Sequence, residues 1–579
     1  MGGRRSFLLL LALYLALATA YSLSLPLGEA PDEADHYAYA RHLALNRSLP
    51  QGPTITQGKH PPLYHAAVAA VAAWTGMDFD FLRSNPDAFP LGPAAPPNFF
   101  VHTTVEAWPW QGGALAMRLG RLLSVLLGAV TVWAAWRLGR DCFAGAAEAG
   151  LLAGAFLATL PGFLFISGAV NNDNAAGAFG SLALVIMAAM IWRGPGLGRS
   201  IRLGLVLGLG LLSKVGTLAL WPLAALATAG GLWPERRRAR AWLVGLGHLA
   251  ISLGIGTLVA SPWLVHNWRL YGDPLGWDLV RATVDQRTSP LGFADLVWLA
   301  RGLFGYFWGR FGAIGQVRLP PWAYLLALAV SLFLLAGIVI FWRRRLSDYR
   351  WRFSVALLAL APLLTLASIV QYSTIALGTD QARLMWPAIA AVGAWAGVGL
   401  AGWGQALRSR RRLAAAGIIV MTSYGLAALL LALRPAFAPP PAVASLTAAE
   451  SLASFGEDFN LVAVALPDHP LAVGETATIT LFWRARQPLA ADLRPVVRLV
   501  HQDGWLAAER DHSPAQGRFS TDRWLAGEVI ADTFTLTPNP ASGGEFALWL
   551  GVRPFRGEWL AAQPSADGVF VRLGSLRFE

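Results

Sequence analysis

The feature that most constrains this chain is a series of long apolar segments separated by short arginine clusters. Hydrophobic residues make up 55% of the 579 residues and charged residues only 14%, which lies outside the composition of a soluble globular protein. Arginine-rich loops between apolar segments are typical of the cytoplasmic loops of polytopic membrane proteins. The sequence therefore predicts a mainly α, multi-pass protein of the cytoplasmic (cell) membrane.

The arginine clusters also predict the topology. If every cluster faces the cytoplasm, the chain crosses the membrane an even number of times between successive clusters, and each interval forms a hairpin with an outer apex. This gives about eleven spanning helices, a cytoplasmic N-terminus and an extracytoplasmic C-terminal region. The clusters are Arg4/Arg5, Arg137/Arg140, Arg193/Arg199/Arg202, Arg236/Arg237/Arg238/Arg240, Arg343/Arg344/Arg345/Arg350/Arg352 and Arg408/Arg410/Arg411/Arg412.

Two regions depart from this charge rule. Arg118 and Arg121 fall at the expected outer end of the second helix, and the expected outer loop 263–319 contains several more arginines. Part of that loop, within residues 290–318, is a candidate re-entrant segment. The apolar stretch between Arg202 and Arg236 is too long for one span of a hydrocarbon core of roughly 30 Å, so we expect it to fold back at its polar point, Lys214.

The composition changes after about residue 455. Strand and hairpin patterns then predict a small antiparallel β-sandwich. These patterns are the alternating segment 478–483, the turn Asp503-Gly504 between two apolar runs, and the apolar segments 546–552 and 569–578. The predicted parts are a transmembrane domain over 1–435 with its first outer loop at 26–111, a proline-containing linker over 436–454 and an extracytoplasmic β-sandwich over 455–579.

Several function classes are disfavoured. The net charge of +12 does not indicate a nucleic-acid partner, because the arginines are distributed as membrane loops are. The sequence has no glycine-rich phosphate loop with a following lysine, so no nucleotide cofactor is expected. The single cysteine, Cys142, excludes an intramolecular disulfide and a cysteine-based metal cluster.

Ionisable residues gather at the expected outer apices. Such groups cost about 2.5 kcal/mol or more each at membrane depth, so several in one layer predict a water-filled functional cavity. Carboxylates could deprotonate an acceptor, and lysine and arginine could neutralise a phosphate leaving group, which suits transfer from a membrane-anchored phosphate. The residues are Asp32, Glu33, Asp35, His36, Lys59, His60, Asp173, Lys214, Asp273 and Arg383.

At these positions, over about residues 1–435, the chain resembles the GT-C superfamily of polyprenyl-phosphate-sugar glycosyltransferases. The resemblance is to the protein O-mannosyltransferase and aminoarabinose transferase branch, glycosyltransferase family 39. Its motifs here are Pro31-Asp32-Glu33 with His36-Tyr37, Lys59-His60-Pro61-Pro62-Leu63-Tyr64, Asp173, Leu212-Ser213-Lys214, Asn267 with Tyr271-Gly272-Asp273-Pro274, Phe307-Trp308-Gly309, and Gln381-Ala382-Arg383 with Trp386-Pro387. Four positions depart from the family pattern: His60 is inserted after the lysine, Ser213 replaces threonine, Ala382 replaces glycine and Leu384 replaces tyrosine.

The resemblance implies an inverting glycosyltransferase that moves a sugar from a polyprenyl-phosphate donor to an acceptor hydroxyl on the outer membrane face. The acceptor would be a glycan, lipid or protein, and membrane lipids would be further partners. The residues that would act are Asp32 and Glu33 as catalytic carboxylates, Lys59, Lys214 and Arg383 as donor-phosphate ligands, and His36, Tyr37, His60, Tyr64, Asn172, Asp173 and Asp273 as other cavity residues.

Individual residues also have simpler interpretations. Asp32 could cap the helix that follows it, Asp173 could pair with Lys214, and Gly-Asp-Pro at Asp273 is also an ordinary turn. Glu33 could orient Asp32, bind a metal or face solvent. A divalent metal is a further alternative, since histidine and carboxylate ligands suit zinc or manganese. The candidate ligands are His36, His60, His266 and Glu33.

Two other functions remain open at this point. A ligase or polymerase of lipid-linked oligosaccharides would use a diphosphate donor. A lipid-linked-glycan or ion transporter would carry ionisable groups near the membrane midplane and usually shows repeat symmetry between its halves. Here the charges belong to outer apices and no repeat is visible, which favours the transferase.

Overall fold

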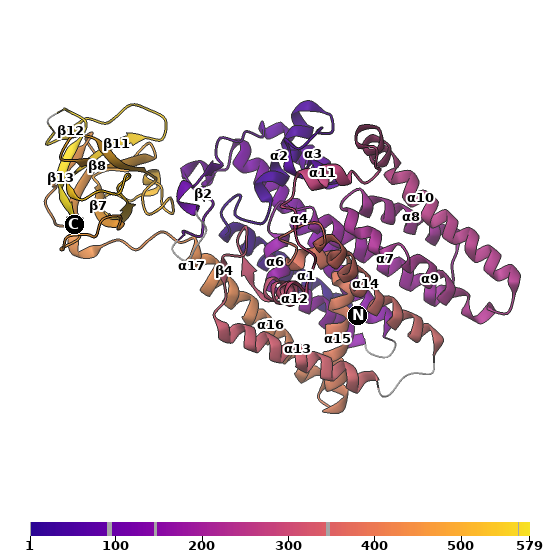
Figure 1. Cartoon of the computed structure of the whole chain (residues 1–579). Coiled ribbons are helices and arrows are strands. Elements are labelled where there is room, and N and C mark those ends of the chain that lie inside the picture. Colours follow the sequence, from indigo (N-terminus) through magenta and orange to yellow (C-terminus); the bar gives the residue numbers. More distant parts are fainter. Residues whose placement is uncertain (1, 90–94, 144–146, 343–347, 566) are drawn as a thin grey trace. The chain divides into compact units, whose positions relative to one another are not determined.

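The computed structural model describes residues 2–89, 95–143, 147–342, 348–565 and 567–579. The arginines of the cluster at 343–345 lie outside these residues. The chain divides into two compact units, both drawn in Figure 1. The first consists of Met1–Leu25, Ala30–Met77 and Leu115–Pro435, and the second of Pro26–Glu29, Asp78–Ala114 and Ala436–Glu579.

The first unit is helical. Its long helices are rich in alanine, leucine and glycine, and their apolar surfaces bury one another in a bundle. The helices are α1 (Gly2–Ser24), α2 (Glu33–Asn46), α3 (Leu63–Ala72), α4 (Gly112–Cys142), α5 (Ala147–Thr159), α6 (Pro161–Ser167), α7 (Asp173–Arg193), α8 (Leu197–Leu211), α9 (Leu223–Leu232), α10 (Ala239–Tyr271), α11 (Trp277–Ala282), α12 (Phe293–Trp308), α13 (Pro321–Trp342), α14 (Tyr349–Ser373), α15 (Ile389–Ala406), α16 (Arg410–Ala428) and α17 (Arg434–Ala436). Short 3₁₀ segments that matter for the site are η1 (Thr56–Lys59), η5 (Val215–Leu220) and η7 (Ala382–Ala388).

The multi-pass prediction is confirmed. Within the described ranges, nine helices are long and apolar enough to cross a membrane. The pair α5 and α6 forms one further candidate, bent by 64° where Pro161 cannot donate a backbone hydrogen bond. Helix α8 has 15 residues and falls below the length of a full span. The described residues thus provide nine candidate spans, or ten with the bent pair, compared with about eleven expected.

The apolar stretch around Lys214 folds back, as predicted. Helix α8 ends just before Lys214, and the segment Val215–Glu235 then returns. Gly231, near the end of that segment, packs so closely on α7 that a Cβ there would lie 2.4 Å from the Met190 carbonyl. The returning segment therefore ends beside the last turn of α7, close to where α8 begins, and Lys214 occupies the apex.

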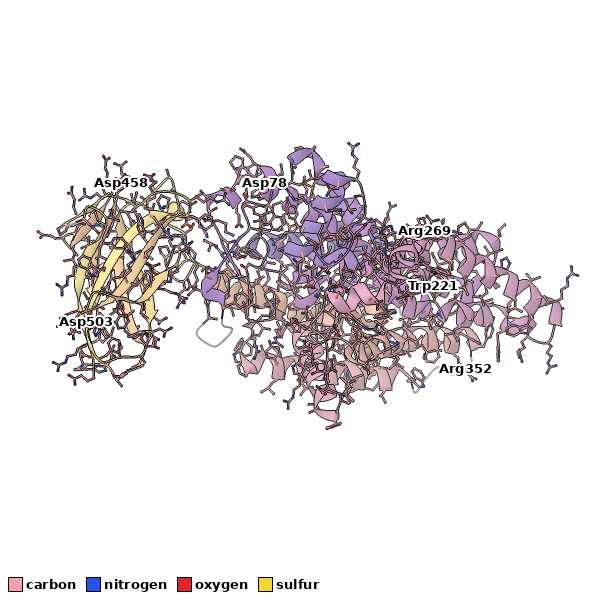
Figure 2. The ribbon with its side chains drawn as sticks, turned by 45° about the horizontal axis from the view of Figure 1, so that its top comes forward. Asp78, Trp221, Arg269, Arg352, Asp458 and Asp503 are labelled. Atoms are coloured by element: carbon pink, nitrogen blue, oxygen red, sulfur yellow. The ribbon has the colours of Figure 1, made fainter. Side chains whose placement is uncertain are left out.

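The second unit contains the predicted β-sandwich. Its five-stranded sheet has the order β10-β7-β6-β5-β12 and its four-stranded sheet the order β13-β11-β8-β9, and all neighbouring strands within them are antiparallel. The turn Asp503-Gly504 joins β8 to β9 as expected, and Asp503 is labelled in Figure 2. The strands are β5 (Ala453–Phe455), β6 (Phe459–Ala465), β7 (Ala477–Ala485), β8 (Leu493–His501), β9 (Leu506–Asp511), β10 (Val529–Leu536), β11 (Gly544–Pro554), β12 (Ala562–Gln563) and β13 (Val571–Phe578).

Part of the first outer loop also belongs to this second unit. Within the loop, β1 (Arg83–Ser84) pairs with β2 (Phe100–Val101). The Asn85 side chain donates a hydrogen bond to the Gln516 carbonyl at 2.9 Å, and the Thr104 hydroxyl donates to Asp522 at 2.7 Å. The division thus differs from the predicted domains, because residues 26–29 and 78–114 cluster with the sandwich.

Two buried histidines in the second unit each lie between two carboxylates. His512 Nδ1 lies 3.2 Å from Asp87 and its Nε2 lies 2.9 Å from Asp532. His102 lies between Glu29 at 3.0 Å and Glu106 at 2.7 Å. Burial alone would lower the pKa of each imidazole, but the flanking carboxylates outweigh it and raise both pKa values to about 9.

These histidines predict a pH dependence of stability. Because both folded-state pKa values exceed the unfolded value of 6.5, their contribution is fully present below about pH 6.5 and is lost as the pH rises through about 9. We expect the unfolding temperature of the second unit, measured by calorimetry on the full chain, to fall between these pH values. His102→Gln/His512→Gln should flatten the dependence, whereas His469→Gln, at an exposed histidine, should leave it intact.

Candidate active site

Asp32 occupies the N-cap position of α2 but does not cap it. Its backbone is left-handed, with φ of 57°, and its side chain makes no capping hydrogen bond. A non-glycine residue in this conformation costs about 1–2 kcal/mol, and such strain is often found at functional sites. The Asp32 carboxylate instead accepts a hydrogen bond from Arg383 Nη2 at 2.5 Å, and 42% of the side chain remains exposed. The geometry therefore argues against the capping interpretation.

Asp32 begins a continuous row of alternating charges. Arg383 also donates through Nη1 to Asp173 Oδ2 at 3.1 Å, and Lys214 Nζ donates to Asp173 Oδ1 at 2.5 Å. Asp173 is fully buried, and Lys214 and Arg383 are nearly so. We call the four residues Asp32, Arg383, Asp173 and Lys214 the ion-pair chain. They come from the start of α2, from η7, from the start of α7 and from the α8–η5 apex.

An asparagine-rich turn holds these segments together. The Asn171 amide donates to the Pro31 carbonyl at 3.1 Å, and its oxygen accepts from the Asp173 backbone N–H at 2.9 Å. The Asn172 amide donates to the Ser213 carbonyl at 3.1 Å. The turn before α7 thus connects the residue preceding Asp32 to the residue preceding Lys214, which places the predicted cavity residue Asn172 at the base of the site.

The electrostatic balance keeps Asp32 ionised. Burial raises the pKa of its carboxyl, but the Arg383 guanidinium, followed by Lys59 and Lys214, lowers it further than burial raises it, so the net pKa lies below the ordinary value. An ionised carboxylate with one side exposed can accept a proton from a bound molecule.

Lys59 lies beside the ion-pair chain rather than within it. Its ammonium donates to the Thr283 carbonyl at 3.0 Å. Burial lowers the pKa of Lys59, and the carboxylates of Asp32 and Asp35 raise it in part, so the three side chains interact electrostatically. A small cavity of about 10 Å³ lies beside Arg383, but neither Lys59 nor Lys214 lines it. A shared phosphate cavity for the two lysines therefore stays a prediction.

Glu33 has a different environment from Asp32, and its contacts favour a structural role, while the catalytic role stays a prediction. Both Glu33 oxygens accept from the Arg121 guanidinium at 2.7 Å, and Oε1 also accepts from the Val170 backbone N–H at 2.9 Å. Arg121 and Glu33 are fully buried. Arg121 further donates to the Ser22 and Leu25 carbonyls, each at 2.7 Å. Glu33 therefore joins the ends of α1 and α2 to α4.

This buried pair predicts a stability effect. Replacing Glu33 by alanine leaves the Arg121 charge buried without its carboxylate, and breaking such a pair typically costs about 3–5 kcal/mol. We expect Glu33→Ala to lower the unfolding temperature and the folded yield in detergent. The double variant Glu33→Ala/Arg121→Met should recover part of the loss, which would not occur if the carboxylate acted only in chemistry.

Arg121 and its neighbour Arg118 also explain one departure from the charge rule. The Arg118 side chain donates to the Ser22 carbonyl at 2.8 Å, next to the Arg121 contacts. Both arginines bind backbone carbonyls where α1 ends. Their positions are therefore explained by these contacts within the fold and not by the charge rule for membrane loops. Sequence reasoning marked them as exceptions but did not reveal their partners.

Two other predicted cavity residues make structural contacts, and a third is buried. The Tyr64 hydroxyl lies 2.7 Å from Ser124 Oγ and accepts from the Asn171 N–H at 2.8 Å. Tyr37 is fully buried. Asp273 accepts from the backbone N–H groups of Leu275 at 3.0 Å and Trp277 at 2.7 Å, so it is an ordinary turn residue, as the alternative interpretation held.

The histidines do not form the suggested metal site. His36 Nδ1 lies 2.9 Å from His65 Nε2, a partner that sequence reasoning missed, and the His36 and His60 rings stack at 6.0 Å. Burial lowers the pKa of His36 and of His60 well below 6.5, which favours neutral rings. In the described part of the chain, no three histidine, cysteine or carboxylate side chains are grouped for a metal ion, and Glu33 is already bound to Arg121.

The chain resembles known proteins in part of its length. Residues 113–266, which are less than half of the chain, match the family model described as dolichyl-phosphate-mannose-protein mannosyltransferase. No curated protein matches the sequence. The crystal structure of ArnT from Cupriavidus metallidurans bound to undecaprenyl phosphate is similar at 15% identity with a TM-score of 0.44, covering 74% of this chain and 73% of that one. An oligosaccharyltransferase from Archaeoglobus fulgidus, in complex with Zn and sulfate, is similar at 14% identity with a TM-score of 0.40, covering 76% of this chain and 55% of that one.

The family match includes two members of the ion-pair chain, Asp173 and Lys214. In this match, in the multi-pass helical fold and in the motifs around Asp32 and Lys59, the chain resembles membrane glycosyltransferases of the GT-C superfamily.

Proposed function

We propose that the protein transfers a sugar from a polyprenyl-phosphate donor to an acceptor hydroxyl on the outer face of the cytoplasmic membrane, with inversion at the anomeric carbon. The observation that carries the proposal is the ion-pair chain, in which one partly exposed carboxylate, Asp32, shares a guanidinium with a buried Asp173–Lys214 pair. Such a row provides a proton acceptor and two cations for an anionic leaving group in one place.

The proposed reaction follows from these positions. The Asp32 carboxylate takes the proton of the acceptor hydroxyl while the hydroxyl oxygen attacks the anomeric carbon. The bond from that carbon to the phosphate oxygen breaks, and its electron pair stays on the polyprenyl phosphate. Arg383 and Lys214 stabilise the negative charge of the phosphate by donating hydrogen bonds to it. The phosphate competes for these N–H groups with Asp32 and Asp173. Lys59 adds a third positive charge nearby.

Mass spectrometry of lipid that co-purifies with the protein tests the donor class. A polyprenyl monophosphate sugar supports the proposal. A polyprenyl diphosphate oligosaccharide found without any monophosphate sugar would contradict it and would favour a ligase or polymerase, because such an enzyme uses the diphosphate lipid as its donor.

The proposed location predicts a topology. Spans that alternate between the arginine clusters place the N-terminus in the cytoplasm and residues 455–579 outside. We expect a reporter that is active only in the cytoplasm to be silent when fused after Glu579 and active when fused within the loop that follows Arg236. Activity of the C-terminal fusion would contradict this topology and the outer location of the site that is inferred from it.

A further inference from the structure

A second cavity, of about 300 Å³, lies beside the ion-pair chain. It is formed by α12, by the hairpin of β3 (Arg310–Phe311) and β4 (Val317–Arg318), by α13 and by the loop before η7. Three guanidinium groups line it, against one carboxylate. The charged lining residues are Arg301, Arg310, Arg318 and Asp380, and the aromatic ones are Trp298, Phe304 and Tyr324.

The single carboxylate of the cavity, Asp380, forms an ion pair with Arg310. Asp380 is buried against α12 at Gly302, where a Cβ atom would lie 2.2 Å from its Oδ2. The same oxygen lies 3.6 Å from Arg310 Nη1, and Arg310 Nε donates to the Gly315 carbonyl at 2.8 Å. Glycine at position 302 therefore allows a fixed Asp380–Arg310 pair at the cavity wall.

The other two arginines lack protein partners. In the described part of the chain, no hydrogen bond or ion pair involves the side chain of Arg301 or of Arg318, and both are exposed. Since arginine stays protonated, the cavity carries an excess of two positive charges. Arg301, Arg310 and Arg318 all fall within the expected outer loop 263–319, where the positive-inside rule disfavours them, so their retention requires a local reason.

The lining specifies the chemical class of a ligand. Planar guanidinium forks suit the several oxygens of a phosphate or diphosphate. Large aromatic side chains at the same elements, Phe293 on α12 and Trp322 on α13, are exposed, as is typical of membrane-interface residues. Arg310 also lines the small cavity beside Arg383, so the two cavities share a wall. A lipid-anchored anion in the second cavity would thus lie next to the proposed reaction site.

We propose that this cavity binds the phosphate or diphosphate group of a second lipid-linked molecule, the sugar acceptor. Anion binding at Arg301 and Arg318 stands independently of the reaction, whereas the acceptor role rests on the proposed function.

Calorimetric titration with geranyl diphosphate and with inorganic diphosphate tests binding. All variants carry Arg383→Gln, which removes one of the three cations of the proposed donor-phosphate site, so any remaining binding at that site is the same in every variant. We expect Arg301→Gln/Arg318→Gln to weaken binding of geranyl diphosphate at least tenfold, because two charge-assisted contacts are lost. Arg269→Gln, at an exposed arginine of α10 labelled in Figure 2, is the matched control and should change nothing.

The outcomes separate the sources of the anion. Geranyl diphosphate that binds more tightly than inorganic diphosphate supports a lipid-linked ligand, whereas equal affinities overturn that part of the proposal. Unchanged affinity in the double variant overturns the site itself.

A transfer assay on the otherwise native protein then tests the acceptor role. Arg301→Gln/Arg318→Gln should raise the KM for the acceptor and leave the KM for the donor unchanged. A raised donor KM would instead assign the cavity to the donor lipid. Absence of transfer in the unmutated protein would contradict the proposed function while leaving the titration result standing.

Discussion

Asp32→Asn should reduce sugar transfer at least 100-fold while leaving the donor lipid bound, because removal of a general base typically costs that much in rate. The amide keeps the shape of the side chain and can still accept a hydrogen bond from Arg383, but it cannot take the acceptor proton. Capping cannot account for a loss, since the Asp32 side chain makes no capping bond to α2. Initial rates of transfer and co-purifying donor lipid are the two measurements.

The matched control for this variant is Asp35→Asn. Asp35 lies on the first turn of the same helix and belongs to neither the ion-pair chain nor the Glu33–Arg121 pair. Its variant should keep most of the activity and nearly the native unfolding temperature. If Asp32→Asn instead works at nearly the native rate, the base is another group. Asp173 would be a poor substitute, because both its oxygens are already bound by Arg383 and Lys214.

The parts of the structure that follow from local patterns were predictable from the sequence. The length of the apolar stretch around Lys214 exceeds one membrane span, so it had to fold back, and it does so at its polar residue. Asp503-Gly504 between two alternating runs dictates a hairpin, and β8 and β9 form it. Placement of Asp32, Asp173, Lys214 and Arg383 at outer apices likewise anticipated that they could meet.

Contacts between distant segments were not predictable. Adjacent carboxylates at Asp32 and Glu33 look equivalent in sequence, but the left-handed backbone at Asp32 turns one toward Arg383 while the other enters a buried pair with Arg121. The loop residue Asp87 meets His512 of the sandwich, and no local periodicity encodes such a contact. The sequence did indicate one such region, because Arg118 and Arg121 are exceptions to the charge rule for membrane loops, and both bind backbone carbonyls in the structure.

Lys214→Ala should lower transfer by about 100- to 1,000-fold, the usual effect of removing one preorganised donor to a developing negative charge. Lys214→Arg should keep part of the activity, because it retains the charge but not the shape of an ammonium. The competing explanation is structural: Lys214 is one of two cations that pair with the fully buried Asp173, so its loss destabilises the fold by up to the roughly 3–5 kcal/mol that breaking a buried ion pair costs.

A double-variant cycle separates these two roles of Lys214. Adding Asp173→Asn to Lys214→Met removes the carboxylate that has lost one of its two cationic partners, so the unfolding temperature should recover in part relative to Lys214→Met alone. Transfer should remain low in the double variant if the ammonium contacts the leaving phosphate, because that contact is absent in both. Recovery of transfer together with stability would mean that Lys214 acts only through Asp173. In that case Arg383 and Lys59 would be the remaining cations for the phosphate, and the ion-pair chain would serve to position Arg383 beside Asp32.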